Sequence, residues 1–277
     1  MLVAMDDGRR GQTASEHGVL GAPDAGYRLD RLPASADLAG LVERHWLVSW
    51  DLPPGRRDTV TLLPHPCVNL VHVDGRVAVA GVGRERFGYP LSGRGRVFGV
   101  KFRPGGFHPF LGRPVADLTE RTVPLWWPGA DRLAAALGGA GDLGELAGVA
   151  EQYLRERRPA ADPVVERVGA IVHTMLHDRT ITTVEQVTDR FGVRARTLQR
   201  MFRRYVGVSP KWVLGRYRLH EAAARIAAGP GGTWAEVAVE LGYFDQPHFI
   251  RDFTRAVGQT PSAYAESCRA GTAAVSA

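Results

Sequence analysis

The sequence predicts an α+β protein with a β-rich N-terminal domain, barrel-like or sandwich, followed by an all-α C-terminal domain. Three observations indicate this. Short β-branched runs separated by turn residues fill residues 26–115, apolar residues recur at helical spacing from about residue 162, and a pattern of about fifty residues occurs twice in that second part. A chain of 277 residues, 44% of them hydrophobic, is long enough to bury two cores.

Composition and residue spacing divide the chain into five segments. Residues 1–25 are rich in Gly, Ala, Ser and charge and lack periodicity, so we expect a disordered tail. The segment RRPAADP, with its prolines and charges, is placed in a linker. The remaining segments are a β-rich sensor or dimerisation domain over 26–130, a helical connector and linker over 131–160, a helical domain over 161–266 and a flexible tail over 267–277.

The β-rich domain is expected from the runs HWLVSW, TVTLL, VNLVHV, VAVAGV and VFGVKF, and its sheet should be mainly antiparallel. Asp74-Gly75 lies between two of these runs and is typical of a tight hairpin turn. The glycine-rich stretches GVGRERFGYP and RPGGF lack a phosphate-loop lysine and are assigned to turns.

The connector should contain two helices, interrupted at the glycines around 138–141 in ADRLAAALGGAGDLGELAGVAEQYLRERR. Just before it, Trp126-Trp127-Pro128 is expected to pack at the junction of the two domains.

Residues 195–205 predict a helix with two different faces, because a set of apolar residues and a set of polar residues each recur at i, i+3, i+4 and i+7. The core face consists of Leu198, Met201, Phe202 and Tyr205. The other face consists of Arg196, Gln199, Arg200 and Arg203. A solvated basic face is the alternative interpretation of an isolated charge run.

A second helix precedes this one, capped by Thr182 or Thr183 and closed by Gly192, which gives a helix-turn-helix layout. Residues 190–225 contain ten Arg or Lys side chains and one acid, Glu221. Such a concentration of positive charge suits phosphate binding with counterion release. Arg and Gln side chains can also hydrogen-bond to the edges of guanine and adenine. The predicted partner is therefore double-stranded DNA, in keeping with the net charge of +6.

The same pattern occurs a second time, starting at Leu241, with Gly192 matching Gly242. The second unit has its own upstream helix, capped by Thr233 with Glu236 in a capping box. Between the units, KWVLGRYRLHEAAARIAAG predicts one helix of about 17 residues, about 26 Å long. Two helices held at that spacing are expected to enter successive major grooves, about 34 Å apart.

Further residues complete the predicted DNA contacts. Phosphate or flanking contacts are expected from Arg194, Arg203, Arg204 and Lys211. In the second unit the outward candidates are Gln246, His248, Arg251 and Arg255. Because Asp245 and Asp252 oppose that second set, base reading should depend mostly on the first unit.

Residues 165–265 closely resemble the DNA-binding domain of the AraC/XylS family of bacterial transcription regulators, through LQRMFRRYVGVSP and VAVELGYFDQPHFIRDFTRAVGQTPSAY. The resemblance implies a tandem helix-turn-helix fold joined by a long helix. It also implies base contacts from Arg196, Gln199 and Arg200, and from Gln246, His248 and Arg251. Pro247 departs from the polar residue usual at its position, which weakens the expectation for the second unit.

The N-terminal half resembles an uncharacterised β-rich domain attached to a subset of these regulators, through LLPHPCVNLVHVDG, GVKFRPGG and DLTERTVPL. Family members commonly use this domain to bind a small effector, to dimerise, or both. Trp46, Trp50 and His72 are candidates for an effector pocket, with core packing as the alternative for the tryptophans. A ligand-free dimerisation or protein-contact module and a catalytic barrel remain alternative functions for this half.

Other chemistry is not expected from the sequence. His65, His72 and His108, with Cys67 and Glu85, lack the spacing of a metal or cupin site, so no metal, cofactor or enzymatic activity is predicted. Cys67 and Cys268 form no disulfide framework, and no signal peptide or apolar run of about 18 residues occurs, which predicts a cytoplasmic protein without membrane contact. RNA polymerase and a second copy of the chain are further candidate partners.

Overall fold

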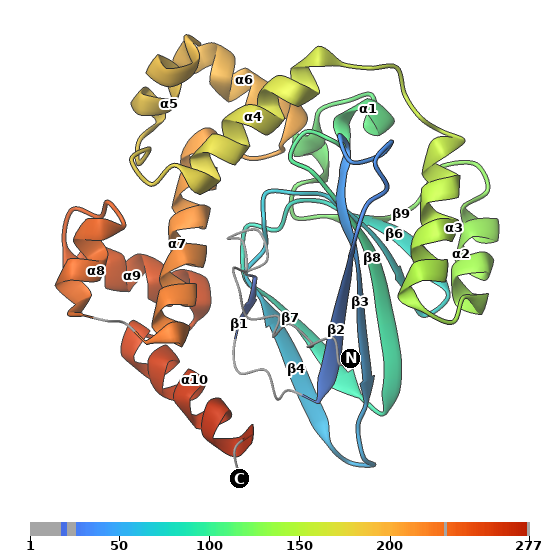
Figure 1. The fold of residues 1–277 in the computed structure, drawn as a ribbon, viewed down its shortest axis with the longest axis horizontal. Helices are drawn as coiled ribbons and strands as arrows, with labels where there is room; N and C mark the ends of the chain where they lie inside the picture. The colour runs from blue at the N-terminus through green and yellow to red at the C-terminus, as the bar shows by residue number, and fades with distance from the viewer. Residues whose placement is uncertain (1–17, 21–25, 230–231, 276–277) are drawn as a thin grey trace, which may run out of the picture.

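The structure is a computed structural model that describes residues 18–20, 26–229 and 232–275 (Figure 1). Strands fill the first half, residues 19–124, and helices fill the second, residues 163–275. The predicted α+β class is confirmed. Within the described residues, no helix is both long enough and apolar enough to cross a membrane.

Two antiparallel sheets build the first half, which we call the β-rich half. In spatial order, the larger sheet contains β2 (Tyr27–Pro33), β3 (Val42–Asp51), β8 (Arg94–Phe102), β5 (Asn69–Val73), β6 (Arg76–Ala80) and β9 (Thr122–Pro124). The smaller sheet contains β1 (Val19–Leu20), β4 (Arg57–Leu62) and β7 (Phe87–Ser92). The described strand pairs are antiparallel, as the sequence predicts.

Two turn predictions had opposite outcomes. The β5–β6 hairpin turns at Asp74 and Gly75 with φ of 49° and 69°, the positive values that a two-residue hairpin turn requires. The turn assignment of GVGRERFGYP was partly wrong, because Phe87–Ser92 pairs with β4 along its whole length. Gly88 and Pro90, which suggested a turn, lie on an edge strand, where a missing N–H donor is tolerated.

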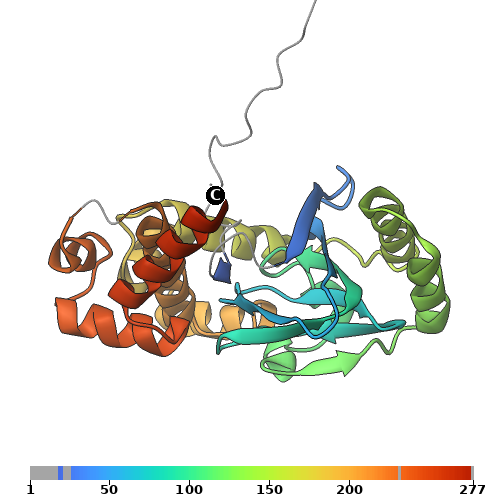
Figure 2. The same cartoon turned by 90° about the horizontal axis from the view of Figure 1, so that it is seen from below.

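The core of the β-rich half lies between the larger sheet and two helices, α2 (Ala130–Gly139) and α3 (Leu143–Arg155), shown beside the sheet in Figure 2. Leu137 and Leu154 of these helices are buried with Phe98 and Val100 of β8. The interruption between the two helices is confirmed, but their assignment to a connector is corrected. Their apolar stripes cover a sheet face and belong to this domain.

Trp127 also belongs to this core and not to a junction between domains. It is 9% exposed and stacks with Phe107 and Phe110 at centroid distances of 5.8 and 5.5 Å. Its neighbour Trp126 is 47% exposed. Adjacent residues in extended chain point in opposite directions, so only one of the pair reaches the core.

The second half, the helical half, follows the predicted order. Its helices are α4 (Pro163–His177), α5 (Val184–Phe191), α6 (Ala195–Tyr205), α7 (Pro210–Ala228), α8 (Trp234–Glu240), α9 (Gln246–Val257) and α10 (Pro261–Val275). Two short elements of the β-rich half, α1 (His108–Leu111) and the 3₁₀ segment η1 (Val115–Leu118), lie next to the end of α6.

The two predicted tails differ from the structure where it describes them. Val19 and Leu20 pair with β4, although most of the segment 1–25 lies outside the described residues. At the other end, α10 continues to Val275, past the expected boundary at 267. Cys268 is 8% exposed against the core of the second unit, and the alanine-rich sequence beyond it favours helix.

Candidate nucleic-acid interface

The first helix-turn-helix unit consists of α5, a short turn and α6. Thr183 caps α5 in a capping box: its side chain accepts from the N–H of Gln186, and the Gln186 side chain accepts from the N–H of Thr183. Gly192 ends α5 in the left-handed region at φ 57°, a conformation that favours glycine. Local sequence therefore sets both ends of α5.

Helix α6 separates core from solvent along the two predicted faces. Its core face is buried and consists of Leu198, Met201, Phe202 and Tyr205. The other face is exposed and consists of Arg196, Gln199, Arg200 and Arg203. Arg194, before the helix, and Lys211, in the first turn of α7, are exposed as well. Fork-shaped guanidinium donors thus project from one side of a helix, as groove reading requires.

Arg204 is engaged elsewhere. Its Nε donates a hydrogen bond to Nε2 of His108 in the β-rich half, 3.1 Å away. The His108 ring lies 4.0 Å from that of Tyr205, whose hydroxyl donates to Asp162 at 2.8 Å. Burial, together with the charge of Arg204, lowers the pKa of His108, which favours the neutral ring that accepts this bond. A phosphate contact by Arg204 would require this bond to break.

Three other arginines of the basic stretch are engaged by other groups of the protein, so the charge count of 190–225 overstates the charge available to DNA. Arg216, Arg218 and Arg225 are buried or half-buried. Their partners are the carbonyl of Arg84 for Arg216, the carbonyls of Gly242 and Thr182 for Arg218, and the carboxylates of Glu221 and Glu240 for Arg225.

The second unit, α8 and α9, repeats the construction of the first. Thr233 and Glu236 form the predicted capping box of α8. Phe249 and Phe253 occupy the positions of Leu198 and Phe202, and all four side chains are fully buried. Pro210 and Pro261 each start the helix that follows a unit, α7 and α10. The internal match therefore reflects equivalent structural roles.

The exposed face of α9 carries less available charge. Asp252 pairs with Arg255 at 2.6 Å and lies 3.6 Å from His248 Nε2. Gln246 is half-buried in the first turn, and Arg251 is exposed. Phe244, which sequence reasoning missed, is 92% exposed just before α9, although nothing in a single sequence distinguishes such a phenylalanine from a core residue. A smaller share of base reading for this unit stays a prediction.

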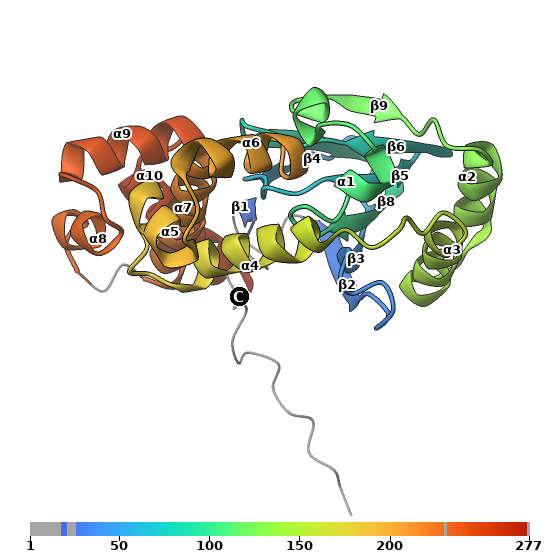
Figure 3. The ribbon, with the colours of Figure 1, turned by 90° about the horizontal axis from the view of Figure 1, so that it is seen from above.

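Helix α7 joins the two units. Its 19 residues correspond to about 28 Å of helix at 1.5 Å per residue. Figure 3 shows α6 and α9 along the same edge of the helical half. The predicted contact with two successive major grooves needs both candidate recognition helices on one edge of the molecule.

The structure does not bring together the predicted effector residues. Trp46 lies over Gly99, where an added Cβ would sit 2.2 Å from the indole, and Trp50 packs against Tyr89 of the smaller sheet. His72 pairs with Phe98 and faces the opposite side, toward α2 and α3. Successive side chains of a strand point to opposite faces of the sheet, and in β3 and β5 this places the two tryptophans on one face and His72 on the other. The predicted effector pocket is therefore corrected.

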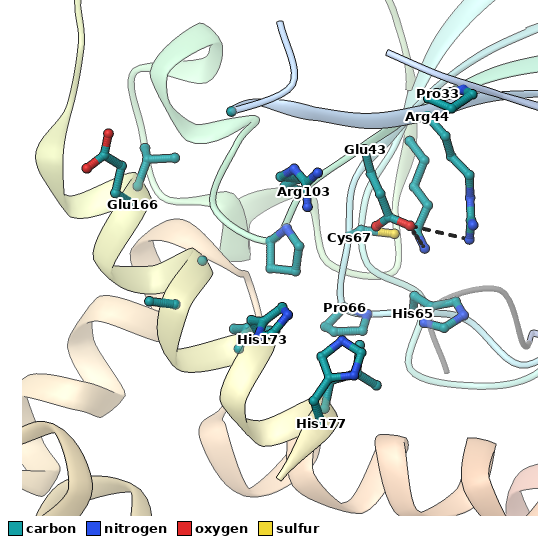
Figure 4. Close-up of a pocket in the computed structure, with 18 of the residues that line it drawn as sticks. Pro33, Glu43, Arg44, His65, Pro66, Cys67, Arg103, Glu166, His173 and His177 are labelled. Atoms are coloured by element: carbon teal, nitrogen blue, oxygen red, sulfur yellow. Dashed lines mark hydrogen bonds and ion pairs between the residues drawn. The ribbon is translucent and has the colours of Figure 1, made fainter. Parts of the chain in front are cut away.

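A cavity of about 740 Å³ lies elsewhere, between the β-rich half and α4 (Figure 4). Sequence reasoning missed it, because its walls come from residues 31–104 and 165–177, which are far apart along the chain. The candidate metal residues are dispersed as well: His65 stacks on His220 of α7 and His108 contacts α6, while His72 is in the sheet core.

Two family comparisons match separate parts of the chain. Residues 187–267 match a family described as "Helix-turn-helix domain", and residues 30–124 match "Domain of unknown function (DUF6597)". The HTH-type transcriptional activator RhaS of Pectobacterium carotovorum is 33% identical over 75 residues, 27% of this chain and 26% of the relative. RhaS of Pectobacterium atrosepticum is 32% identical over the same length. The match spans about a quarter of these relatives.

Solved structures show a distant likeness. ToxT from Vibrio cholerae is 10% identical, with a TM-score of 0.39 over 87% of this chain and 97% of that one. A structure of the xylose-binding transcription activator XylR is 20% identical, with a TM-score of 0.31 over 44% of this chain and 37% of that one.

Proposed function

We propose that this chain, whose residues 187–267 form a helix-turn-helix domain of the AraC/XylS type, is a transcription regulator that binds double-stranded DNA at specific sequences. The observation that carries the proposal is the exposed face of α6, built from Arg196, Gln199 and Arg200 on a helix whose other face is fully packed. Such a helix presents donors and an amide to base edges in the major groove.

The two units have unequal roles in this proposal. Helix α6 reads bases, with Arg194, Arg203 and Lys211 on flanking phosphates. Helix α9 enters the next groove and contributes Arg251 and Gln246, while Asp252 restrains His248 and Arg255. The expected site is asymmetric and about two helical turns long.

The rest of the function follows from this activity. A DNA-binding regulator acts in the compartment that holds DNA, the cytoplasm of a bacterium, and needs no catalytic step of its own. The β-rich half carries the regulatory input, which we propose to be a small effector. RNA polymerase and a second copy of the chain stay predictions as partners.

The test begins with selecting, from genomic fragments, the DNA that the purified full chain retains. Against the selected site, Arg200→Ala should cost about 1–3 kcal/mol of binding free energy and relax the preference at one base pair. Arg203→Ala is the matched control, since it removes an exposed arginine from the same helix without removing a proposed base reader. It should weaken selected and random DNA alike and reduce the salt slope by about one.

Two results would contradict the proposal. One is a selection that enriches no sequence. The other is equal loss for Arg200→Ala and Arg203→Ala on both selected and random DNA, because a base contact must discriminate between them.

A further inference from the structure

The cavity of about 740 Å³ lies where the two halves of the molecule meet. One wall is formed by residues of β2, β3 and β8 and by the segment before β5, and the other by α4, while Tyr217 of α7 also lines it. Figure 4 shows His173 and His177 on α4 facing Pro66 and His65 across this space. The volume falls within the range of about 300–1,000 Å³ that small-molecule sites occupy.

Helix α4 leaves this space open through its small residues. Val168, Ile171 and Met175 form its buried face in the core of the first unit. Gly169 and Ala170 line the cavity instead, and a Cβ added at Gly169 would meet nothing within 4 Å. A glycine inside a helix lowers the free energy of unfolding by about 0.5–1 kcal/mol relative to alanine, so the open space beside Gly169 has a stability cost.

The charged side chains around the cavity favour an anion. The cations are Arg31, Arg44, Lys101 and Arg103, and the carboxylates are Glu43 and Glu166. Lys101 is 5% exposed, and its Nζ lies 3.0 Å from Oε1 of Glu43, which also accepts a contact from Arg44 at 3.4 Å. Buried lysines are rare and costly, and this one lies on a cavity wall with other cations.

Apolar side chains form a further part of the wall. Val165, Val172 and Leu176 of α4 and Pro66 and Pro104 of the β-rich half supply carbon surface. A bare inorganic ion would leave this surface in water, whereas an apolar group attached to an anionic head would cover it.

We propose that this cavity binds a small organic anion, a carboxylate or phosphate ester with an apolar body, held between the β-rich half and α4. Its regulatory consequence rests on the proposed function. Asp162, the N-cap residue of α4, accepts the hydroxyl hydrogen bond of Tyr205 in α6. A ligand that fixes α4 against the sheet therefore bears directly on the helix proposed to read DNA.

The test measures ligand binding to the full chain without DNA. Calorimetry compares 3-phenylpropionate, phenyl phosphate and the neutral 3-phenylpropionamide, which share a phenyl body and differ in the head group. We expect one or both anions to bind at least about tenfold tighter than the amide, a difference of about 1.4 kcal/mol. The two anionic arms distinguish carboxylate from phosphate. Hydrogen exchange should slow in α4 and at 99–104 on binding.

Two glycine variants locate the site. Gly169→Phe places a phenyl ring in the cavity and should weaken anion binding at least about tenfold. Gly148→Phe is the matched control, since Gly148 lies exposed inside helix α3 with nothing within 4 Å of an added Cβ. It should leave binding unchanged. If Gly169→Phe does not fold, the site is located by two other measurements: the anion affinity of Arg31→Gln, a variant at the exposed side of the cavity, and the map of slowed hydrogen exchange.

The proposal is overturned if none of the probes binds at millimolar concentration, if the amide binds as tightly as the anions, or if exchange slows away from α4. Equal binding by wild type and folded Gly169→Phe also overturns it. Because the experiment contains no DNA, failure to bind an anion leaves the DNA-binding proposal standing. Conversely, a chain that binds the anion but selects no DNA sequence would overturn only the DNA-binding proposal.

Discussion

At the scale of single residues, His108 links the two halves of the molecule. Its ring lies 4.0 Å from that of Tyr205 and accepts a hydrogen bond from Arg204, so the end of α6 is held by a side chain of the β-rich half. Protonation would place a second positive charge beside Arg204. The contact is therefore formed with the neutral ring, in agreement with the lowered pKa of His108.

Acid should weaken this contact. Because folding lowers the pKa of His108, the unfolded chain binds a proton below about pH 6.5 that the folded protein does not. The stability contributed by the neutral ring is present above that pH and falls as the pH falls. We expect the melting temperature to drop between pH 7.5 and 5.5, and to drop less in His108→Gln, which keeps an acceptor without a titratable ring.

Two other buried histidines also contribute to the pH dependence of stability and must be taken into account in that measurement. Burial also lowers the pKa of His45 and His72, so part of the acid sensitivity should persist in His108→Gln. An identical drop in wild type and His108→Gln would show that the His108–Arg204 contact has no titratable role.

At the scale of elements, each helix-turn-helix unit is defined by signals at its own helix ends. Capping boxes at Thr183 and Thr233 start the first helix of each unit, and Gly192 and Gly258 end α5 and α9 in the left-handed region. These interactions lie within a few residues of each other in the sequence. That is why the helix limits of both units could be predicted.

The cap of α5 provides a direct test. Thr183→Ala removes the acceptor for the N–H of Gln186 and should lower the free energy of unfolding by about 1 kcal/mol. Urea unfolding of the full chain measures the loss. Thr183→Ser keeps the hydroxyl and should retain most of the stability, so equal losses for the two variants would argue against capping as the cause.

At the scale of the whole molecule, the β-rich half contacts both units. Thr119 donates to the carbonyl of Gly207 after α6, at 2.7 Å, and Arg86 donates to the carbonyl of Val257 at the end of α9, at 3.0 Å. Leu63 is buried in the core of the second unit. The relative position of α6 and α9 therefore depends on the β-rich half as well as on α7.

The limits of the β-rich domain follow from its core and can be tested by truncation. A fragment of residues 1–160 keeps α2 and α3 over the sheet and should fold cooperatively. A fragment of residues 1–128 exposes the sheet face occupied by Leu137 and Leu154 and should aggregate or lack dispersed NMR signals. A well-folded 1–128 fragment would restore the boundary near residue 130 that the sequence suggested.

The fold class, the β5–β6 hairpin, the two repeated units and the buried and exposed faces of α6 could all be predicted from the amino-acid sequence. Each depends on periodicity or on contacts a few residues apart, such as Asp74-Gly75 or Thr183 with Gln186. Three further features are visible only in the folded molecule: α2 and α3 belong to the sheet core, Arg204 binds His108, and a cavity opens against α4. Those features join residues far apart along the chain. A sequence pattern shows that a side chain will be buried or paired, but it does not identify the distant residue that it contacts.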